Sequence, residues 1–316
     1  MHCFARWPPF DAVMTDLTAI ILTYNERENL PPCLASLKPL GCPVFVVDSG
    51  SADGTQDIAA AHGATVVAHP FSTHAAQWQW ALANLPLTAD WVLALDADQR
   101  LTPELAEELR RRFGRGGGSN NGIDGFYVNR RQVFRGRWIR HGAYYPKYLL
   151  KLFRRDAVAL DVNDLVDHHF YVRGTTGKLR HDIIEENKKE DDITFWIAKH
   201  NRYAALMAQE ELSASGRPPA VTPALFGSPD QRVLRLKGLW RSLPLFLRPC
   251  LYFGYRYFLR GGWLDGKEGF IFHFLQGFWF RLLVDIKMEE LRTRRGVAAE
   301  VPSPSGDGAP ARTHRT

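Results

Sequence analysis

The chain has 316 residues, of which 45% are hydrophobic and 23% charged, and its formal net charge is +6. This composition is ordinary for a folded globular protein and excludes a chain that is disordered, collagen-like or fibrous over most of its length. Residues 230–295 hold 13 of the 40 basic residues but only 6 of the 34 acidic ones, so this segment carries +7 and the rest carries −1. That distribution argues against a nucleic-acid-binding protein that is basic over its whole surface.

The N-terminal residues precede the first predicted strand. We expect residues 1–15 to be a disordered extension and translation to begin at Met14, which opens a run leading directly into that strand. The four cysteines lack metal-type spacing, which favours a reducing compartment and a cytoplasmic location: Cys3, Cys33, Cys42 and Cys250. No uninterrupted apolar run reaches the ~18 residues of a membrane-spanning helix, so none is expected.

Short apolar runs alternate with helical patterns over the first 100 residues. Four runs are typical of strands buried on both faces: Thr18–Thr23, Val44–Asp48, Ala64–Ala68 and Trp91–Asp96. Helices are predicted between them, at Glu28–Lys38, Thr55–Ala61 and Thr73–Leu85. Strands that alternate with helices indicate an α/β fold with a mostly parallel central sheet.

The next elements complete a predicted domain. Thr102 as N-cap and Pro103 at the first helical position indicate a helix that ends near Arg112. Two strands and a long amphipathic helix follow, at Gly125–Arg130, Tyr148–Phe153 and Asp191–Glu211. We therefore divide the chain into the extension at 1–15, an α/β domain at 16–212, a linker at 213–229, a basic aromatic helical segment at 230–296 and a disordered tail at 297–316.

Polar residues end three of the four predicted strands. They are Thr23-Tyr24-Asn25-Glu26, Asp48-Ser49-Gly50-Ser51-Ala52-Asp53-Gly54 and Asp96-Ala97-Asp98. Ligands of open α/β sheets bind at this edge. Turn preference alone explains the second segment. It explains Asp96 and Asp98 poorly, because two carboxylates at i and i+2 lie on one face and repel each other unless a cation or hydrogen-bond donors lie between them. A divalent ion that bridges to a diphosphate would explain the pair.

The motifs TYNE, VVDSGSADGT and LDAD, in this order and strand context, resemble the inverting family 2 glycosyltransferases of the Rossmann-like GT-A fold. The resemblance covers roughly residues 16–210. It implies the following roles: Thr23, Tyr24, Asn25 and Glu26 line the nucleotide site, Asp48 contacts the base of a nucleotide-sugar, Ser49 and Asp53 belong to the same binding loop, Asp96 faces the ribose or sugar, and Asp98 binds Mg²⁺ or Mn²⁺.

Two further positions bear on the donor site. The family often has Glu after LDAD, where this chain has Gln99. An amide cannot carry that carboxylate's charge, which puts any donor or metal contact there in question. The segment Phe71–Leu85 resembles the family's helix after the third strand, and its Gln77 falls near the donor pocket, whereas we expect Trp78 to be a packing residue.

Inverting transfer requires a general base for the acceptor hydroxyl, commonly a carboxylate. The segment LDVNDLVDHHFYV offers Asp161, Asp164 and Asp167, where related enzymes often carry a His-Glu pair. We select Asp167 as the base and Asp164 as the second choice.

Other acidic and histidine residues lie nearby. One of His168, His169 or His181 is a candidate further metal ligand, with ordinary burial or solvation as an equal alternative. Glu185 and Glu186 are a second acidic candidate, although we favour their interpretation as the solvated start of a helix.

The basic and aromatic stretch Arg130–Tyr148 could bind nucleic acid. It fits better as the lid and acceptor face of a sugar-transferring fold, where arginines meet phosphates. Its flanks, GFYVNR and KYLLKLFRR, resemble a subgroup that acts in lipopolysaccharide-core and related cell-envelope glycan synthesis.

The C-terminal segment combines positive charge with aromatic residues. Residues 239–286 hold 14 of the 38 aromatic residues of the chain, with arginines between them. Apolar faces flanked by basic residues are typical of helices that lie in a membrane interface. A helical subdomain packed on the core or on a second subunit is the alternative, and we favour contact with an anionic membrane.

These observations predict a GT-A fold with a C-terminal helical, membrane-interfacial appendage. The predicted activity is inverting transfer from a nucleotide-sugar, with UDP-sugars favoured, to a lipid-linked or lipopolysaccharide-type acceptor. The protein would lie on the inner face of the cytoplasmic membrane, with Mg²⁺ or Mn²⁺ and without nucleic acid. The alternatives are a nucleotidyltransferase, although TYNERENL is neither Gly-rich nor strongly basic, and a non-catalytic glycan-binding or scaffold relative.

Overall fold

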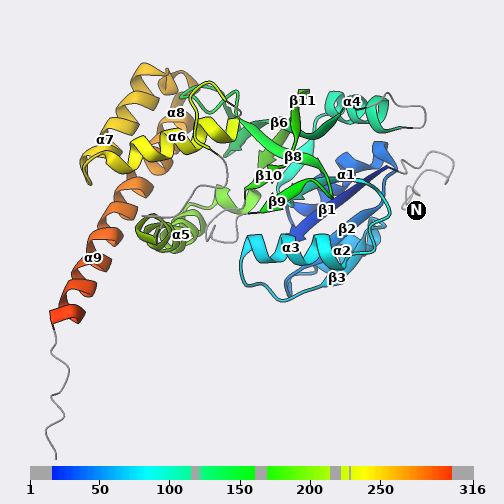
Figure 1. The fold of residues 1–316 in the computed structure, drawn as a ribbon, viewed down its shortest axis with the longest axis horizontal. Coiled ribbons are helices and arrows are strands. Elements are labelled where there is room, and N and C mark those ends of the chain that lie inside the picture. Colours follow the sequence, from blue (N-terminus) through cyan, green and yellow to red (C-terminus); the bar gives the residue numbers. More distant parts are fainter. Residues whose placement is uncertain are drawn as a thin grey trace, which may run out of the picture.

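A computed structural model describes residues 16–114, 120, 122–160, 169–213, 222–227 and 229–300, and side chains up to residue 294. A mixed β-sheet with flanking helices forms one half, and the C-terminal helices form the other (Figure 1). The strands are β1 (Leu17–Thr23), β2 (Val44–Asp48), β3 (Thr65–Ala68), β4 (Trp91–Asp96), β5 (Gln99–Leu101), β6 (Ile123–Phe134), β7 (Arg137–Ile139), β8 (Tyr148–Arg154), β9 (Val158–Leu160), β10 (Phe170–Val172) and β11 (Thr175–Glu186).

Helices connect and cover these strands. They are α1 (Leu30–Leu37), α2 (Thr55–Ala61), α3 (His74–Asn84), α4 (Pro103–Phe113), α5 (Ile193–Ser213), α6 (Pro229–Ser242), α7 (Leu247–Gly254), α8 (Gly266–Phe272) and α9 (Phe280–Glu300). Short 3₁₀ turns lie at Lys38–Leu40, Lys188–Asp191 and Gly262–Asp265, and π-helical turns at Tyr255–Leu259 and His273–Trp279.

The sheet has the order β3-β2-β1-β4-β8-β6-β11-β5, with β7 paired to β6. The pairs among β1, β2, β3 and β4 are parallel, as the alternating pattern predicts. Beyond β4 the sheet is mixed, because β8 is antiparallel to both β4 and β6. The predicted α/β class and the C-terminal helical region are confirmed. One detail was wrong: β3 is a partly exposed edge strand and is not buried on both faces.

Alternating side chains of the central strands build two cores. Ala19 and Ile21 of β1 pack with Leu34 of α1 and Leu105 of α4 on one face. Residue Ile20 points to the other face, against α3, as the two-residue period of a strand requires. Trp78 is fully buried there, in an edge contact with Phe170, so the expected packing role of Trp78 is confirmed.

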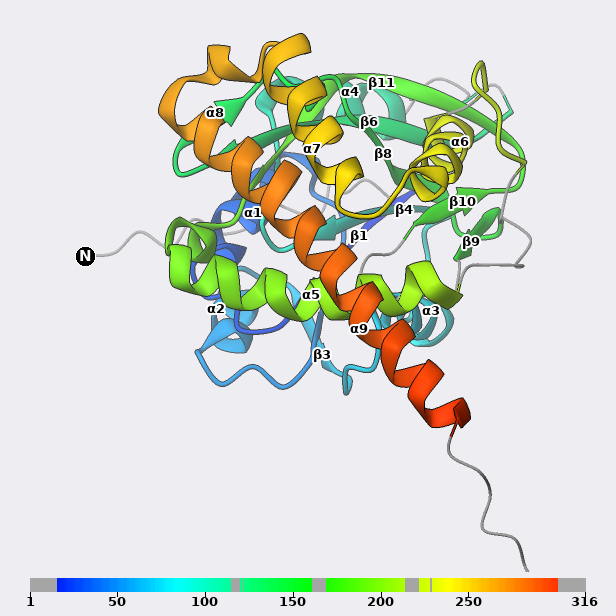
Figure 2. The ribbon, with the colours of Figure 1, turned by 90° about the vertical axis from the view of Figure 1, so that its left-hand side faces the viewer.

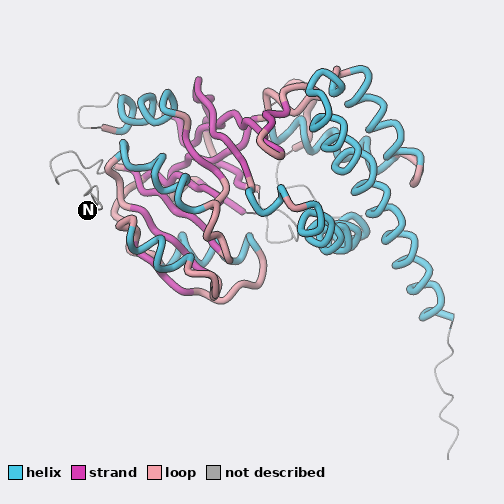
Figure 3. Tube along the Cα trace, turned by 180° about the vertical axis from the view of Figure 1, so that it is seen from behind, coloured by secondary structure: helices cyan, strands magenta, loops and turns pink. Residues whose placement is uncertain are grey.

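The C-terminal helices pack on the rest of the protein through a third core. Trp196 and Ala204 of α5 contact Phe280 and Val284 of α9, and Phe134 of β6 joins them. Figure 2 shows α9 crossing α5 obliquely, and Figure 3 shows α9 extending away from the sheet. Since these contacts are apolar and buried, removal of the C-terminal helices would expose the surface of α5.

One continuous helical stretch, Gly262–Arg294, is long and apolar enough to cross a membrane by length and composition. No membrane-spanning helix was expected from the sequence, because charged and polar residues interrupt the apolar residues of this stretch. Of the 18-residue part of this stretch that is apolar enough, 39% is buried inside the protein. Core helices of globular proteins meet the same test, and the contacts of Phe280 and Val284 with α5 explain part of the apolarity.

A buried histidine lies where the C-terminal helices meet the β7–β8 loop. His273 is fully buried, neither ring nitrogen has a hydrogen-bond partner, and the ring lies against Gly142 and Gly262, where a Cβ atom would collide with it. Burial, with a smaller contribution from Arg256, lowers the pKa of His273 from 6.5 to about 4. The ring is therefore neutral at physiological pH.

We expect the protein to lose stability below pH 6.5 because of His273. The unfolded chain takes up a proton near pH 6.5 while the folded protein does not until about pH 4, so the free energy of unfolding falls as pH falls. Between pH 7.5 and pH 5 the loss is about 2 kcal/mol. Urea denaturation at both pH values measures it, and His273→Asn should remove most of the difference. An unchanged difference in that variant would assign the effect to other groups.

Candidate functional site

The loops after β1 and β2 are joined by side-chain hydrogen bonds. The backbone amide of Asn25 donates to Ser51 Oγ at 2.8 Å, and the Asn25 side-chain oxygen accepts from the amide of Ala52 at 2.9 Å. The amide of Arg27 donates to Asp53 Oδ2 at 3.0 Å. Asn25 has a φ of +53°, which asparagine tolerates better than most residues. These bonds fix the edge of the sheet at which the sequence analysis placed the nucleotide.

Asp48 lies at the end of β2 and is fully buried. Its carboxylate accepts hydrogen bonds from Thr23 Oγ1 at 2.9 Å, from Gln56 Nε2 at 2.7 Å and from the amide of Ser51 at 2.8 Å, with further bonds from the Ser51 hydroxyl and the Gly50 amide. Burial alone would raise the pKa of Asp48, but these donors outweigh it and lower the pKa. Asp48 therefore organises its own loop as an anion, and its predicted contact with a base stays a prediction.

Gln77 connects α3 to the ends of β2 and β3. Its amide nitrogen donates to Ser49 Oγ at 3.1 Å, and its oxygen lies 2.7 Å from His69 Nδ1. The His69 ring stacks on Trp80 at 4.0 Å between centroids. Gln77 is fully buried, so it positions Ser49 and His69 beside the loop after β2. Tyr24, in contrast, is 59% exposed.

Asp96 and Asp98 follow β4 and have different surroundings. Lys151 Nζ of β8, itself nearly buried, lies 2.8 Å from Asp96 Oδ2. The nearest donor to the Asp98 carboxylate is Asn187 Nδ2, at 3.2 Å. Burial and the negative charges of Glu185 and Asp96 raise the pKa of Asp98 well above its usual value. The positive charge of Lys199 offsets this increase only in part. Asp98 therefore has a neutral hydrogen-bond partner, whereas the adjacent carboxylate of Asp96 has the cation Lys151.

Gln99 is buried and connects β5 to β11. Its Nε2 donates to Glu185 Oε2 at 2.7 Å, and its Oε1 accepts from the amide of Asp96 at 3.2 Å. Arg130 Nη1 holds the other Glu185 oxygen at 2.7 Å. A glutamate at position 99 would place two carboxylates in contact. The Gln99 amide thus donates to a second carboxylate, that of Glu185, which lies near Asp98.

The 3₁₀ turn at Lys188–Asp191 and the preceding Asn187 contact the loop after β1. Lys189 Nζ lies 2.6 Å from Glu26 Oε1. Asn29 Nδ2 donates to Glu26 Oε2 at 2.7 Å and to Asn187 Oδ1 at 3.0 Å. Through these bonds the end of β11 is fixed against the loop after β1, and Asn187 reaches Asp98.

The structure brings most predicted donor-site residues to one edge of the sheet. They are Thr23, Tyr24, Asn25, Glu26, Asp48, Ser49, Asp53, Gln77, Asp96 and Asp98. Their individual roles stay predictions. The expected bases Asp164 and Asp167, and with them Asp161 and His168, lie outside the described residues. His169 is described and precedes β10.

Sequence reasoning missed part of this site. Glu185 and Glu186 lie at the end of β11 and not at the start of a helix, so that interpretation was wrong. Glu185 approaches Asp98, and Glu186 pairs with Arg100 at 2.8 Å. Lys151 was also missed, although the charged centre of YLLKLF, a lysine inside an apolar strand, is the signal that could have identified it.

The residues of this edge fit a divalent cation bound together with a diphosphate. Within the described ranges, no group of three or more His, Cys, Asp or Glu side chains is arranged as a complete metal cage. Mg²⁺ is commonly held by one or two carboxylates while phosphates and waters supply the other ligands. Asp98, with its raised pKa and without a cationic hydrogen-bond partner, matches that requirement.

Comparison with known proteins gives the following similarities. Residues 18–174 match the family model described as glycosyl transferase family 2. An uncharacterized glycosyltransferase of Rickettsia bellii is 36% identical over 97 residues, covering 31% of this chain and 32% of the relative. An uncharacterized glycosyltransferase of Mycobacterium bovis is 35% identical over 97 residues, 29% of this chain and 43% of the relative. The chain spans about a third of the length of the first of these curated relatives.

Two solved structures are similar to this chain at low identity. S. aureus TarS 1-349 matches with a TM-score of 0.40 and 14% identity, covering 89% of this chain and 92% of that one. The glucosyl-3-phosphoglycerate synthase of Mycobacterium tuberculosis, in complex with Mn²⁺, UDP and phosphoglyceric acid, matches with a TM-score of 0.41 and 16% identity, covering 66% of this chain and 82% of that one.

Proposed function

Because this chain belongs to glycosyl transferase family 2 through residues 18–174, we propose that it transfers a sugar, with inversion, from a nucleotide-sugar to an acceptor glycan or lipid. The observation that carries the proposal is the placement of Asp98. This carboxylate lies at the carboxyl edge of parallel strands, beside Asp96 and Glu185, and has no cationic hydrogen-bond partner. A UDP-sugar is the donor that we favour.

In this proposal, the loops after β1 and β2 hold the nucleoside. Tyr24 offers an exposed ring for stacking on the base, and Asn25 and Asp53 keep the two loops together. Asp96, paired with Lys151, faces the ribose or sugar. Asp98 would hold Mg²⁺ or Mn²⁺, which when bound would stabilise the charge of the departing nucleoside diphosphate. Lys151 and Lys189 add positive charge around the same site.

The general base in this proposal is Asp167, with Asp164 as the alternative. We expect Asp167→Asn to abolish transfer because an amide cannot accept the proton of the acceptor hydroxyl. Donor binding, measured by calorimetry, should stay within about twofold of the wild type. The same change at Asp164 is the matched comparison. Near-normal turnover of the Asp167 variant would clear Asp167 of this role and leave Asp164 to be tested in its place.

The acceptor in this proposal is associated with a membrane, as in lipopolysaccharide or other cell-envelope glycan synthesis. Segment 230–296 would hold the enzyme on the inner face of the cytoplasmic membrane. Two features support this: its net positive charge and its exposed apolar side chains, such as Leu239, Leu251 and Phe258. Point variants test this better than deletion of the C-terminal helices, because α9 covers the apolar surface of α5.

A panel of nucleotide-sugars tests the activity. The purified protein is incubated with each donor, with Mn²⁺ or Mg²⁺, and with a membrane glycolipid extract as acceptor. Release of nucleoside diphosphate with one donor class supports the proposal. Release of pyrophosphate from nucleoside triphosphate and sugar phosphate would instead indicate a nucleotidyltransferase. Donor binding without any product would indicate a non-catalytic relative.

A further inference from the structure

Exposed large hydrophobic side chains are distributed unevenly over the described residues. Of the 21 such side chains, 16 lie between residues 222 and 294, and 5 belong to residues 16–213. The second set is scattered over separate elements, as is normal for a globular protein. The first set is concentrated on the C-terminal helices, which occupy one end of the molecule (Figure 1).

The highest exposure on these helices occurs at one corner, where the π-helical turn Tyr255–Leu259 meets the 3₁₀ turn Gly262–Asp265. Four apolar side chains of this corner face solvent: Phe258 at 63%, Leu259 at 79%, Trp263 at 55% and Leu264 at 49% exposure. We call residues 258–264 the apolar corner. Isolated exposed residues need no explanation, but four large ones where two turns meet favour a partner that covers them.

Hydrogen bonds join the apolar corner to the β7–β8 loop. The amide of Gly142 donates to the carbonyl of Arg260 at 3.0 Å, and Arg256 donates to the carbonyl of Gly142 at 2.8 Å. Asp265, itself buried, accepts from the amide of His141 at 2.9 Å, and its other oxygen lies 2.7 Å from His141 Nδ1. The loop and the corner therefore form one unit, although they lie more than 110 residues apart.

The β6–β7 hairpin presents basic side chains beside this unit. Its turn, Arg135-Gly136, has positive φ at both residues, as in tight hairpin turns. Arg135, Arg137 and Arg140 are exposed, and Arg140 also lies 4.7 Å from the ring of Trp138. The corner adds the exposed residue Arg260, and the following helix α8 adds Lys267.

Acidic side chains are rare in this region. Described residues 231–274 contain eight basic and two acidic residues, of which Arg248 and Asp265 are buried, so seven basic residues and one acidic residue remain. The surface is therefore apolar at its tip and positively charged around it.

We propose that the apolar corner and the β6–β7 hairpin together form a docking surface for an anionic lipid bilayer. Phe258, Leu259, Trp263 and Leu264 enter the interface, and Arg137 and Arg140 meet the headgroups. This inference rests on the proposed function in one respect, the membrane-associated acceptor. It goes beyond segment 230–296 because it includes a hairpin of the α/β domain. Since the hairpin continues into the predicted acceptor lid, membrane contact would orient that lid toward lipid-linked acceptors.

Vesicle binding of the full chain tests the docking surface. Phosphatidylglycerol-phosphatidylcholine vesicles are compared with pure phosphatidylcholine vesicles by co-sedimentation. Neutralisation of two charges, in Arg137→Gln with Arg140→Gln, should weaken binding to the anionic vesicles about thirtyfold. The matched control, Arg110→Gln with Arg111→Gln, removes the same charge from exposed positions of α4, at the far end of the longest axis (Figure 1), and should change binding less than about twofold.

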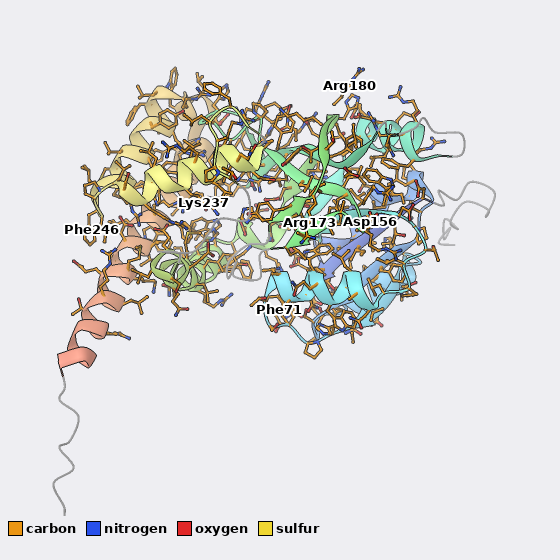
Figure 4. All side chains as sticks on the ribbon, viewed as in Figure 1. Phe71, Asp156, Arg173, Arg180, Lys237 and Phe246 are labelled. Atoms are coloured by element: carbon orange, nitrogen blue, oxygen red, sulfur yellow. The ribbon has the colours of Figure 1, made fainter. Side chains whose placement is uncertain are left out.

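The apolar part is tested separately. Trp263→Ser with Leu264→Ser should weaken binding at least about tenfold. The control is Phe71→Ser, which removes a side chain of 51% exposure from the loop before α3, away from the C-terminal helices (Figure 4). Brominated lipid should quench the tryptophan fluorescence of the wild type more than that of Trp263→Phe, since the proposal places Trp263 next to the acyl chains.

Two outcomes would overturn this proposal. One is unchanged vesicle binding in both corner and hairpin variants. The other is a wild-type protein that is a dimer in sedimentation velocity and a Trp263→Ser, Leu264→Ser variant that is a monomer but still binds vesicles. That result would mean that a second copy of the chain covers the corner. Asp98→Asn should bind vesicles like the wild type. Failure of the docking surface and failure of the proposed function are therefore distinguishable.

Discussion

Replacement of Asp98 by asparagine should reduce turnover about 10³-fold, since a divalent ion contributes several kcal/mol to stabilisation of the departing charge. Asparagine keeps the size of the side chain and can still accept the hydrogen bond from Asn187. It removes the negative charge that a cation requires. Release of nucleoside diphosphate at saturating donor measures the effect.

The same variant should be folded and at least as thermally stable as the wild type. Burial and the charges of Glu185 and Asp96 oppose ionisation of Asp98, so removal of its charge relieves repulsion in the protein without ligand. Asp57→Asn, at an exposed position of α2, is the control and should leave turnover and stability unchanged. Turnover of Asp98→Asn within about twofold of the wild type would contradict a metal-binding role.

Replacement of Arg248 by methionine should reduce the free energy of unfolding by about 3–5 kcal/mol. Arg248 is almost fully buried in α7, where it pairs with Asp285 of α9 and, at 3.0 Å, with Glu211 of α5. Methionine fills a similar volume but leaves two buried carboxylates without a counter-charge. Urea denaturation measures the change.

Two further variants make the Arg248 result specific. Arg241→Met, in exposed α6, should alter stability by less than about 0.5 kcal/mol. Arg248→Met combined with Asp285→Asn should recover part of the loss, because asparagine is neutral and can still accept from the amide of Phe246. A loss below about 1 kcal/mol in the single variant would show that the C-terminal helices do not depend on this ion pair.

The parallel half of the sheet could be predicted because three of its strands, β1, β2 and β4, are buried. Ile20, Ile21, Val46 and Val47 are almost free of solvent, so their apolar runs stand out in the sequence. Thr102 was recognisable as an N-cap, and it does accept the amide of Leu105 at 3.2 Å. The capping signal is local and needs no knowledge of the tertiary structure.

β11 could not be predicted in the same way, because its charged residues are paired within the protein. Asp182 is buried and accepts from Asn129 at 3.0 Å and from Arg131 at 2.7 Å. Glu185 is held between Arg130 and Gln99. A segment with these charges resembles a solvated loop or helix start, and partners more than 50 residues away turn it into a strand.

The candidate site likewise contains residues that could be predicted from the sequence and residues that could not. Residues that follow strands directly, such as Asp48 and Asp98, could be found from the sequence, since the carboxyl ends of parallel strands share one edge. Lys151, Glu185 and Lys189 reach that edge from antiparallel or later elements. Gln99 departs from the family pattern in the sequence, but its contact with Glu185 depends on the pairing of β5 with β11, which the sequence did not predict.

Calorimetric titration of UDP into the full chain, with and without Mn²⁺, tests the central claim most directly. The account predicts that Mn²⁺ tightens UDP binding at least about tenfold in the wild type, and that this gain disappears in Asp98→Asn while it persists in Asp57→Asn. The other nucleoside diphosphates, titrated in the same way, identify the base that the loops after β1 and β2 prefer. A metal-assisted nucleotide-sugar site at this edge of the sheet would be contradicted by either of two results. In one, Mn²⁺ does not change the affinity for any nucleoside diphosphate; in the other, Asp98→Asn binds the diphosphates as the wild type does, with and without Mn²⁺.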